Sequence, residues 1–184
     1  GLFAELSSQF AYLMAMHRHR GDVVEKLQAM VSDYTDATRS DRGVIGVGAR
    51  VSHVGEMIDV QVGPAAQIVG AQRLHNGTIL SEADAVTEVG AAVVAEDFII
   101  AEGAQVVDGV VLHSCFVGQG SKMGKQFSAE NSLFFANCEG FHGEACSIFA
   151  GPYTVTHHKS TLLIAGIYSF YNAGSGTNQS NHMY

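Results

Sequence analysis

Apolar residues return at every sixth position between Val94 and Phe141. Compact residues such as Ala104, Val110 and Ser121 stand two places before the next apolar position. Six is a multiple of the strand period of two, but a flat sheet has no reason to restart its pattern every six residues. The pattern therefore predicts short parallel strands separated by corners. The apolar positions form two registers joined by a single five-residue step, Val94, Ile100, Val106 and Leu112, then Val117, Met123, Ala129, Phe135 and Phe141.

The same repeat begins earlier in the chain, at Ile45 and Val51, and continues at strict spacing through Val62, Ile68, Leu74 and Leu80. Its register breaks after that point, because Leu80 and Val94 lie fourteen positions apart instead of twelve. We therefore expect residues 81–87 to form a loop extruded from the repeat. Acidic residues in or beside this loop are interpreted as a solvated rim, namely Glu82, Asp84 and Glu88.

Two amphipathic segments precede the repeat, over residues 2–19 and 22–35, and each places its apolar residues on one helical stripe. Gly21 can end the first helix and Asp22 can begin the second. The sequence thus predicts a helical hairpin as one unit, residues 1–40, followed by the repeat unit, residues 41–184. The polar segment 35–42, closed by Gly43, is predicted to link them.

Charge and composition exclude several classes of function. The formal net charge is −8 with ten basic residues, which argues against nucleic acid or an anionic membrane as partner. No apolar run reaches the roughly 18 residues of a membrane span, and no signal peptide is visible, so a cytoplasmic protein is expected. The first residue is not Met, which indicates a piece of a longer chain. The three cysteines are interpreted as buried reduced thiols, Cys115, Cys138 and Cys146.

The segment V-G-Q-G-S-K-M-G-K, residues 117–125, resembles the repeats of the hexapeptide-repeat transferase superfamily. The resemblance implies a mainly β fold, a left-handed parallel β-helix of triangular section with three hexads to a coil. About seven coils are expected. A left-handed coil opposes the usual right-handed crossover and needs residues that accept left-handed corner dihedrals. Such residues are present at Asp108, Gly109, Gly118, Gly120, Asn131 and Asn137.

Polar groups, aromatic rings and histidines are concentrated from Phe127 onward. The aromatic residues Phe134, Phe135, Phe141 and Phe149 are predicted to lie in the core. The asparagines at 131 and 137, six positions apart, are predicted to form a corner ladder. The candidate functional side chains are Glu130, Asn131, Asn137, Glu139, His142, Glu144, His157 and His158.

The segment A-G-P-Y-T-V-T-H, residues 150–157, is similar to the T-x-T-H segment of hexapeptide-repeat sugar O-acetyltransferases. The resemblance implies that His157 is a general base at a cleft between two subunits of a homotrimer. A histidine suits this role because its pKa lies near working pH. The implied donor is acetyl-coenzyme A or another acyl thioester, and the implied acceptor is a sugar-type small molecule. We expect His158 and Glu139 to complete the catalytic group, and the substrate-binding residues to be Asn131, Asn137, His142 and Tyr153.

Two other functions remain open. The segment F-S-A-E-N-S-L-F-F-A-N-C-E, residues 127–139, and the tail N-A-G-S-G-T-N-Q-S-N-H-M-Y, residues 172–184, look like pieces of larger uncharacterised bacterial hexapeptide-repeat proteins. That resemblance supports the fold and leaves a non-catalytic scaffold or ligand-binding module as an alternative. A zinc hydratase of the carbonic anhydrase type would need three histidine ligands. The spacing of the available histidines does not fit it, so no metal site is predicted, at His113, His142, His157 or His158.

Overall fold

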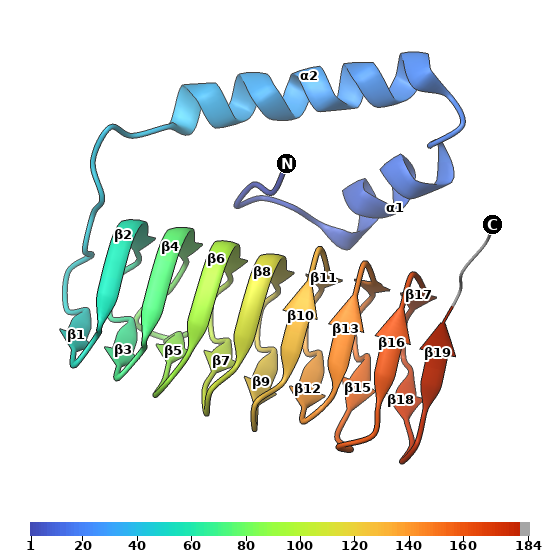
Figure 1. Cartoon of the computed structure of the whole chain (residues 1–184). Helices are drawn as coiled ribbons and strands as arrows, with labels where there is room; N and C mark the ends of the chain where they lie inside the picture. Colours follow the sequence, from blue (N-terminus) through green and yellow to red (C-terminus); the bar gives the residue numbers. More distant parts are fainter. Residues whose placement is uncertain (181–184) are drawn as a thin grey trace.

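The computed structural model describes residues 1–180, so the last four residues of the tail segment lie outside the described part. Two helices, α1 (Ser8–Met16) and α2 (Gly21–Thr38), precede a parallel β-helix (Figure 1). The strands at the front rise, and the chain returns behind them as the coils advance from left to right, which is the left-handed sense. All strand pairs of the β-helix are parallel among the described residues. The fold class predicted from the sequence is therefore confirmed.

The β-helix has three faces, which we number in chain order around a coil. Face 1 consists of β10 (Ser128–Glu130), β13 (Glu144–Cys146), β16 (Leu162–Ile164), β19 (Asn178–Ser180) and the first halves of four longer strands, β2 (Glu56–Val62), β4 (Arg73–Ile79), β6 (Val94–Ile100) and β8 (Val111–Val117). Face 2 consists of the second halves of those four strands with β11 (Leu133–Phe134), β14 (Phe149–Ala150) and β17 (Ile167–Tyr168). Face 3 consists of β1 (Arg50–Ser52), β3 (Gln67–Val69), β5 (Glu88–Val89), β7 (Gln105–Val106), β9 (Lys122–Gly124), β12 (Glu139–Phe141), β15 (Val155–Thr156) and β18 (Asn172–Ala173).

Several coils are shorter than three hexads. Val94 pairs with Val111, and Val111 with Ser128, so each of these coils contains 17 residues instead of 18. The missing residue is lost at the corner between faces 1 and 2, where Asp97 and Ser114 both have φ of 53°. The five-residue step predicted once recurs in every coil at this corner. Eight strands form face 3 in the described chain, one more than the seven coils predicted.

This shorter coil changes which residues point inward. Ile100 and Val106 are buried as the hexad pattern predicts, but Val94 is half-buried on the outside. Its neighbour Ala95 is fully buried instead. The compact positions Ala104, Val110 and Ser121 are each 0 % exposed, because two inward residues fit on each short side.

The aromatic residues of the last coils divide between the interior and the outer surface. Phe134 lies in the core of the β-helix. Phe135 is buried outside it, in a cluster with Ala11 of α1. Phe149 is half-buried and packs against Phe135 in the same outer cluster, whereas Phe141 is half-buried on the outer surface, so neither lies in the interior of the β-helix. The strand alternation that buries Phe134 turns its neighbour outward, where a helix covers it.

The predicted loop over residues 81–87 is confirmed by the register. Arg73 pairs with Val94, which gives that coil 21 residues. The Thr87 hydroxyl donates to the carbonyl oxygen of Leu80 at 2.7 Å and lies 3.1 Å from that of Ala101. These contacts fasten the end of the loop to the coil, so the four additional residues project without disturbing the next strand.

The helical hairpin is confirmed, with shifted ends. The side chain of Ser7 accepts a hydrogen bond from the backbone N–H of Phe10, so α1 begins at Ser8 rather than at Leu2. Ala11 of α1 packs on the outside of face 2 against Ile99 and Phe116. Helix α2 runs along the coils above α1 (Figure 1) and has no fully buried residue. Neither helix is long and apolar enough to cross a membrane, in the part of the chain that is described.

Candidate functional site

His157 follows β15 on the outside of face 3, and its Nε2 contacts the Glu139 carboxylate, which projects from the preceding coil. The side chains are 45 % and 33 % exposed, so the pair is accessible to solvent. Glu139 begins β12 and pairs in register with Val155, two residues before His157. The parallel stacking of two coils therefore positions the pair. Among the candidate carboxylates Glu130, Glu139 and Glu144, Glu139 contacts this imidazole.

The pair lies beside an aromatic surface. The ring of Phe141 lies 5.2 Å from the imidazole of His157, between ring centroids. Gly124 leaves room for that ring, because a Cβ there would approach it to 3.2 Å. Lys125 places its Nζ 5.6 Å from the centroid of the same ring. An imidazole, a carboxylate and an ammonium group thus surround one half-buried phenyl ring on face 3.

The structure does not bring the other predicted site residues together around His157. His158 is exposed in the loop before β16. Asn131 lies at the corner between faces 1 and 2, where its Nδ2 donates to Glu130 at 3.3 Å. Asn137 lies at a different corner, between faces 2 and 3. The two asparagines therefore do not stack on each other. Six positions correspond to one side of the triangle and not to one coil.

Tyr153 occupies the same corner as Asn137, one coil further on. It stacks on Phe170 with 5.7 Å between ring centroids and an interplanar angle of 15°. Both aromatic residues have positive φ, 60° and 52°, and they are 53 % and 78 % exposed. Bulky side chains rarely adopt this backbone conformation. The corner therefore displays an exposed aromatic stack that is separate from the His157 pair.

His142 lies at the corner between faces 3 and 1 and lines a hollow of about 500 Å³. Lys159 and Glu144 line the same hollow. The predicted substrate-binding residues are therefore distributed over three corners, and no single hollow collects them.

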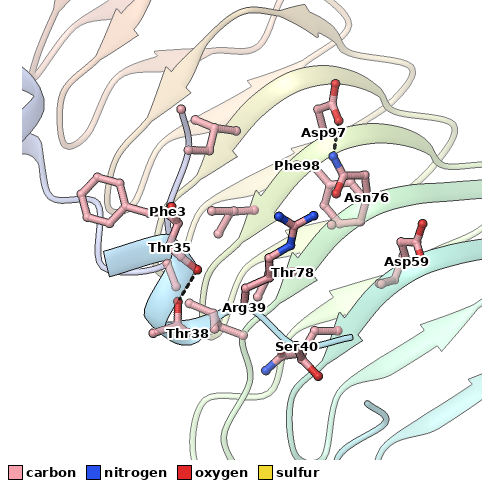
Figure 2. Close-up of a pocket in the computed structure, with 18 of the residues that line it drawn as sticks. Phe3, Thr35, Thr38, Arg39, Ser40, Asp59, Asn76, Thr78, Asp97 and Phe98 are labelled. Atoms are coloured by element: carbon pink, nitrogen blue, oxygen red, sulfur yellow. Dashed lines mark hydrogen bonds between the residues drawn. The ribbon is translucent and has the colours of Figure 1, made fainter. Parts of the chain in front are cut away.

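A larger cavity, of about 1040 Å³, lies between the end of α2, the N-terminal segment and the corner between faces 1 and 2 (Figure 2). The Asn76 amide donates to the Asp97 carboxylate at 2.6 Å on its wall. The exposed guanidinium of Arg39 points toward this pair from the opposite side. Arg39 makes no ion pair with any described residue. The cavity thus offers one free cationic group facing an amide and a carboxylate.

The hydrophobic pattern does not indicate this cavity, although the residues along its wall follow a regular spacing. One row of corner residues lies along this wall, formed by Asp59, Asn76, Asp97 and Ser114. Asn76 follows Asp59 by 17 positions, and Ser114 follows Asp97 by 17 positions. A period of 17 aligns Asp59 with Asn76 and Asp97 with Ser114, and the loop over residues 81–87 lengthens the step between the two pairs to 21. The hexad period of 18 shifts the alignment by one position per coil and hides the row.

Two of the three cysteines match their prediction. Burial raises the pKa of the Cys115 and Cys138 thiols to about 11. Cys146 is half-buried and projects from the outside of face 1, so it was not correctly placed in the core. No group of thiols suited to a metal is present in the described chain.

Comparison with known proteins places the fold in a family without an assigned function. A protein of Treponema pallidum (strain Nichols), described as an uncharacterized protein, is 28 % identical over 115 residues. The match covers 62 % of this chain and 14 % of the relative, so the chain spans a small part of that protein. The matching family model, described as "Domain of unknown function (DUF4954)", covers residues 1–184. The parallel β-helix agrees with the fold that the hexapeptide-repeat resemblance implies, and the family model shows that the chain belongs to the DUF4954 family.

Proposed function

We propose that face 3 carries an acyl-transfer site in which His157 is the general base and Glu139 orients it. The observation that supports this proposal is the contact between Nε2 of His157 and the Glu139 carboxylate on an exposed surface. A base oriented by a carboxylate is a recurring arrangement in acyl transfer. The resemblance of residues 150–157 to the T-x-T-H segment of sugar O-acetyltransferases points to the same residue.

The proposed step needs one proton transfer. In the tautomer that donates Nε2–H to Glu139, the Nδ1 atom of His157 carries the free lone pair. Nδ1 takes the proton from an acceptor hydroxyl as its oxygen attacks the carbonyl carbon of an acyl thioester such as acetyl-coenzyme A. The carbon–sulfur bond then breaks, and the thiolate leaves with the proton that His157 returns. Glu139 stabilises the imidazolium between these two events.

A second subunit would complete this site. The His157 pair lies on an outer face, and acyl transfer requires a site that positions both substrates and excludes water. We therefore propose that the protein forms a trimer and that a neighbouring subunit covers the pair. Light scattering tests the association, and a monomer at high micromolar concentration would contradict this part of the proposal.

The catalytic role is tested by His157→Ala and Glu139→Gln, with His19→Ala as a matched exposed histidine on the helical hairpin. Coenzyme A release from acetyl-coenzyme A, with a panel of sugar acceptors, is followed by chromatography because the protein carries its own thiols. His157→Ala should reduce the rate by about 10² to 10⁴-fold, and His19→Ala should leave it unchanged. Circular dichroism confirms that the variants fold. An unchanged rate in His157→Ala, or no acetyl-coenzyme A binding at millimolar concentration, would refute the proposal.

A second candidate function is non-catalytic binding of a small polar ligand, favoured by the cavity beside the end of α2. Its volume of about 1040 Å³ suits a small molecule, and Arg39 faces Asn76 and Asp97 across it. Calorimetric titration with sugars and sugar phosphates tests this function. Binding that is lost in Arg39→Ala and kept in His157→Ala would favour the cavity over the acyl-transfer site.

A further inference from the structure

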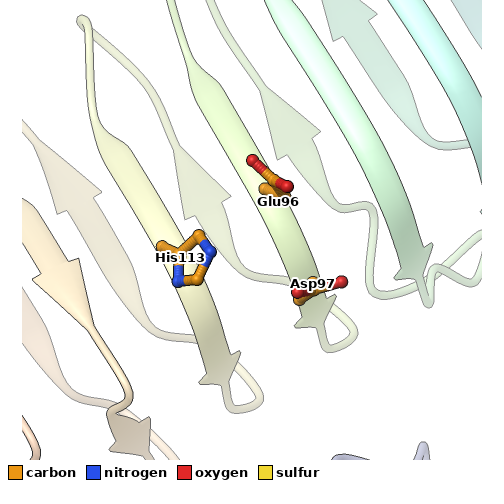
Figure 3. Close-up of side chains that lie close together, drawn as sticks. All are labelled: Glu96, Asp97 and His113. Atoms are coloured by element: carbon orange, nitrogen blue, oxygen red, sulfur yellow. The ribbon is translucent and has the colours of Figure 1, made fainter.

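Three side chains with metal-binding atoms converge on the outside of the β-helix, at the edge between faces 1 and 2 (Figure 3). One ligand atom from each of Glu96, Asp97 and His113 lies within 4.8 Å of the other two. Glu96 and Asp97 are half-buried and His113 is exposed. The group lies on other faces and coils than the His157 pair, so it has no part in the proposed acyl transfer.

The coil geometry explains why these residues meet. Glu96 pairs in register with His113 of the next coil, so their side chains project side by side from face 1. Asp97 follows Glu96 directly and would point inward in a straight strand. Its φ of 53° turns the chain at that residue, and its carboxylate remains on the outer side. The left-handed corner thus adds a second carboxylate to a Glu–His pair.

We propose that Glu96, Asp97 and His113 bind one divalent transition-metal ion, with Zn²⁺ as the ion that fits best. A tetrahedral zinc ion with bonds of about 2.0 to 2.2 Å requires ligand atoms roughly 3.3 Å apart. Atoms within 4.8 Å of one another reach that spacing by small side-chain rotations. The three protein ligands leave a fourth position for water.

The ligand types select the ion. An imidazole nitrogen with two carboxylate oxygens suits zinc and its first-row neighbours, whereas Mg²⁺ and Ca²⁺ prefer sites made of oxygen atoms alone. The group contains no thiolate, which removes the preference for Cu(I). We therefore expect Zn²⁺ to bind far more tightly than Mg²⁺.

Neighbouring groups hold two of the ligands in place. The Asn76 amide donates to Asp97 Oδ1 at 2.6 Å, and the Ser114 hydroxyl lies 3.4 Å from Nδ1 of His113. Such outer contacts fix the orientation of metal ligands. Arg73 approaches Glu96 at 3.9 Å and competes with the metal for this carboxylate. Both partners of that ion pair are almost half exposed, so the competition is weak.

Because Asp97 also lines the cavity beside α2, the ion would lie at the edge of that cavity. The water on the metal would then be accessible to an anionic or hydroxyl group of a molecule bound there. This placement makes the cavity and the metal group parts of one surface, distinct from face 3.

The test uses the chain purified without a histidine tag and freed of metal with a chelator. Zn²⁺ is titrated in competition with a chromophoric chelator, and Mg²⁺ is titrated separately. We expect one Zn²⁺ per chain, and we expect Glu96→Gln, Asp97→Asn and His113→Ala each to weaken binding by at least about 10- to 100-fold. Asp97→Asn is chosen because Asn accepts the same corner conformation.

Two variants serve as controls. Glu130→Gln removes a carboxylate from the next coil on the other side of His113, outside the group, and should leave Zn²⁺ binding unchanged. Arg73→Gln removes the competing guanidinium and should tighten it. Circular dichroism checks folding. Equal Zn²⁺ affinity in the wild type and His113→Ala, an equal loss in Glu130→Gln, or no stoichiometric binding at about 100 µM Zn²⁺, far above the affinity of built zinc sites, would overturn the proposal.

Discussion

Gly77 lies in β4 on the wall of the cavity beside α2, and the ring of Phe98 from the next coil covers it. A Cβ at residue 77 would lie 2.2 Å from two carbon atoms of that ring. Phe98 is only 2 % exposed, so its ring has no open space into which it can retreat. Gly77→Ala therefore forces the ring or the two coils to shift.

The expected loss of stability follows from two opposing effects. Overpacking a filled interior costs about 1 to 3 kcal/mol. Replacing glycine by alanine restricts the unfolded chain and returns about 0.4 to 1 kcal/mol. Gly77→Ala should therefore lower the free energy of unfolding by about 1 to 2 kcal/mol. Gly174→Ala is the matched control, because no atom lies within 4 Å of a Cβ at that site, and it should be neutral or slightly stabilising.

Urea unfolding followed by circular dichroism measures both variants, with the midpoint as readout and the slope as a check on cooperativity. The double variant Gly77→Ala/Phe98→Leu should lose less stability than the sum of the two single variants, because the smaller side chain leaves room for the Cβ. The expected coupling free energy is about 0.5 to 3 kcal/mol. Equal midpoints for Gly77→Ala and Gly174→Ala, or additive effects in the double variant, would refute the reasoning.

Two further predictions concern the thiols and the helical hairpin. Because burial raises the pKa of Cys115 and Cys138 to about 11, only about one in a thousand of these thiols is ionised at pH 8, and iodoacetamide should label Cys146 first in peptide mass spectra. Faster labelling of Cys138 than of Cys146 would contradict this prediction. The raised pKa values of the buried thiols also stabilise the folded state below pH 9, and this contribution is lost as pH rises from 9 toward 11. Ala11→Glu should bury a charge against face 2 and release α1, so that limited proteolysis cuts the hairpin while the coils remain intact. Gln9→Glu changes an exposed residue of the same helix and should not increase cleavage of the hairpin. Equal cleavage of both variants would contradict the packing of α1 on face 2.

The sequence predicted the type of fold because the interior of a β-helix repeats its physical demands in every coil. Leu112 and Val117 stand five positions apart, but a single occurrence of that interval gave no reason to expect it in each coil. The left-handed residue at that corner has no apolar signature, since Asp97, Ser114 and Asn131 all occupy it. The pattern of hydrophobic residues therefore cannot indicate this corner position.

The candidate sites were less predictable for the same reason. The resemblance of residues 150–157 indicated His157, and Glu139 was expected beside it, but their contact depends on the register between coils, which the hydrophobic pattern does not define. The Asp97 row depended on the 17-residue period itself. The number of residues on each face of a coil determines which residues of neighbouring coils are in contact. An error of one residue in that number shifts every outer side chain by one position relative to its neighbour.

The helical hairpin covers the outside of face 2, and this leaves two sides of the triangular prism for lateral contact. Two different free sides allow copies to join head to tail, with face 1 of one copy against face 3 of the next. Such contacts close into a ring when the rotation between copies fits, and the ring has an inner wall made of both faces. In a three-membered ring of this kind, the Glu96 group of one copy and the His157 pair of its neighbour would line the same interface.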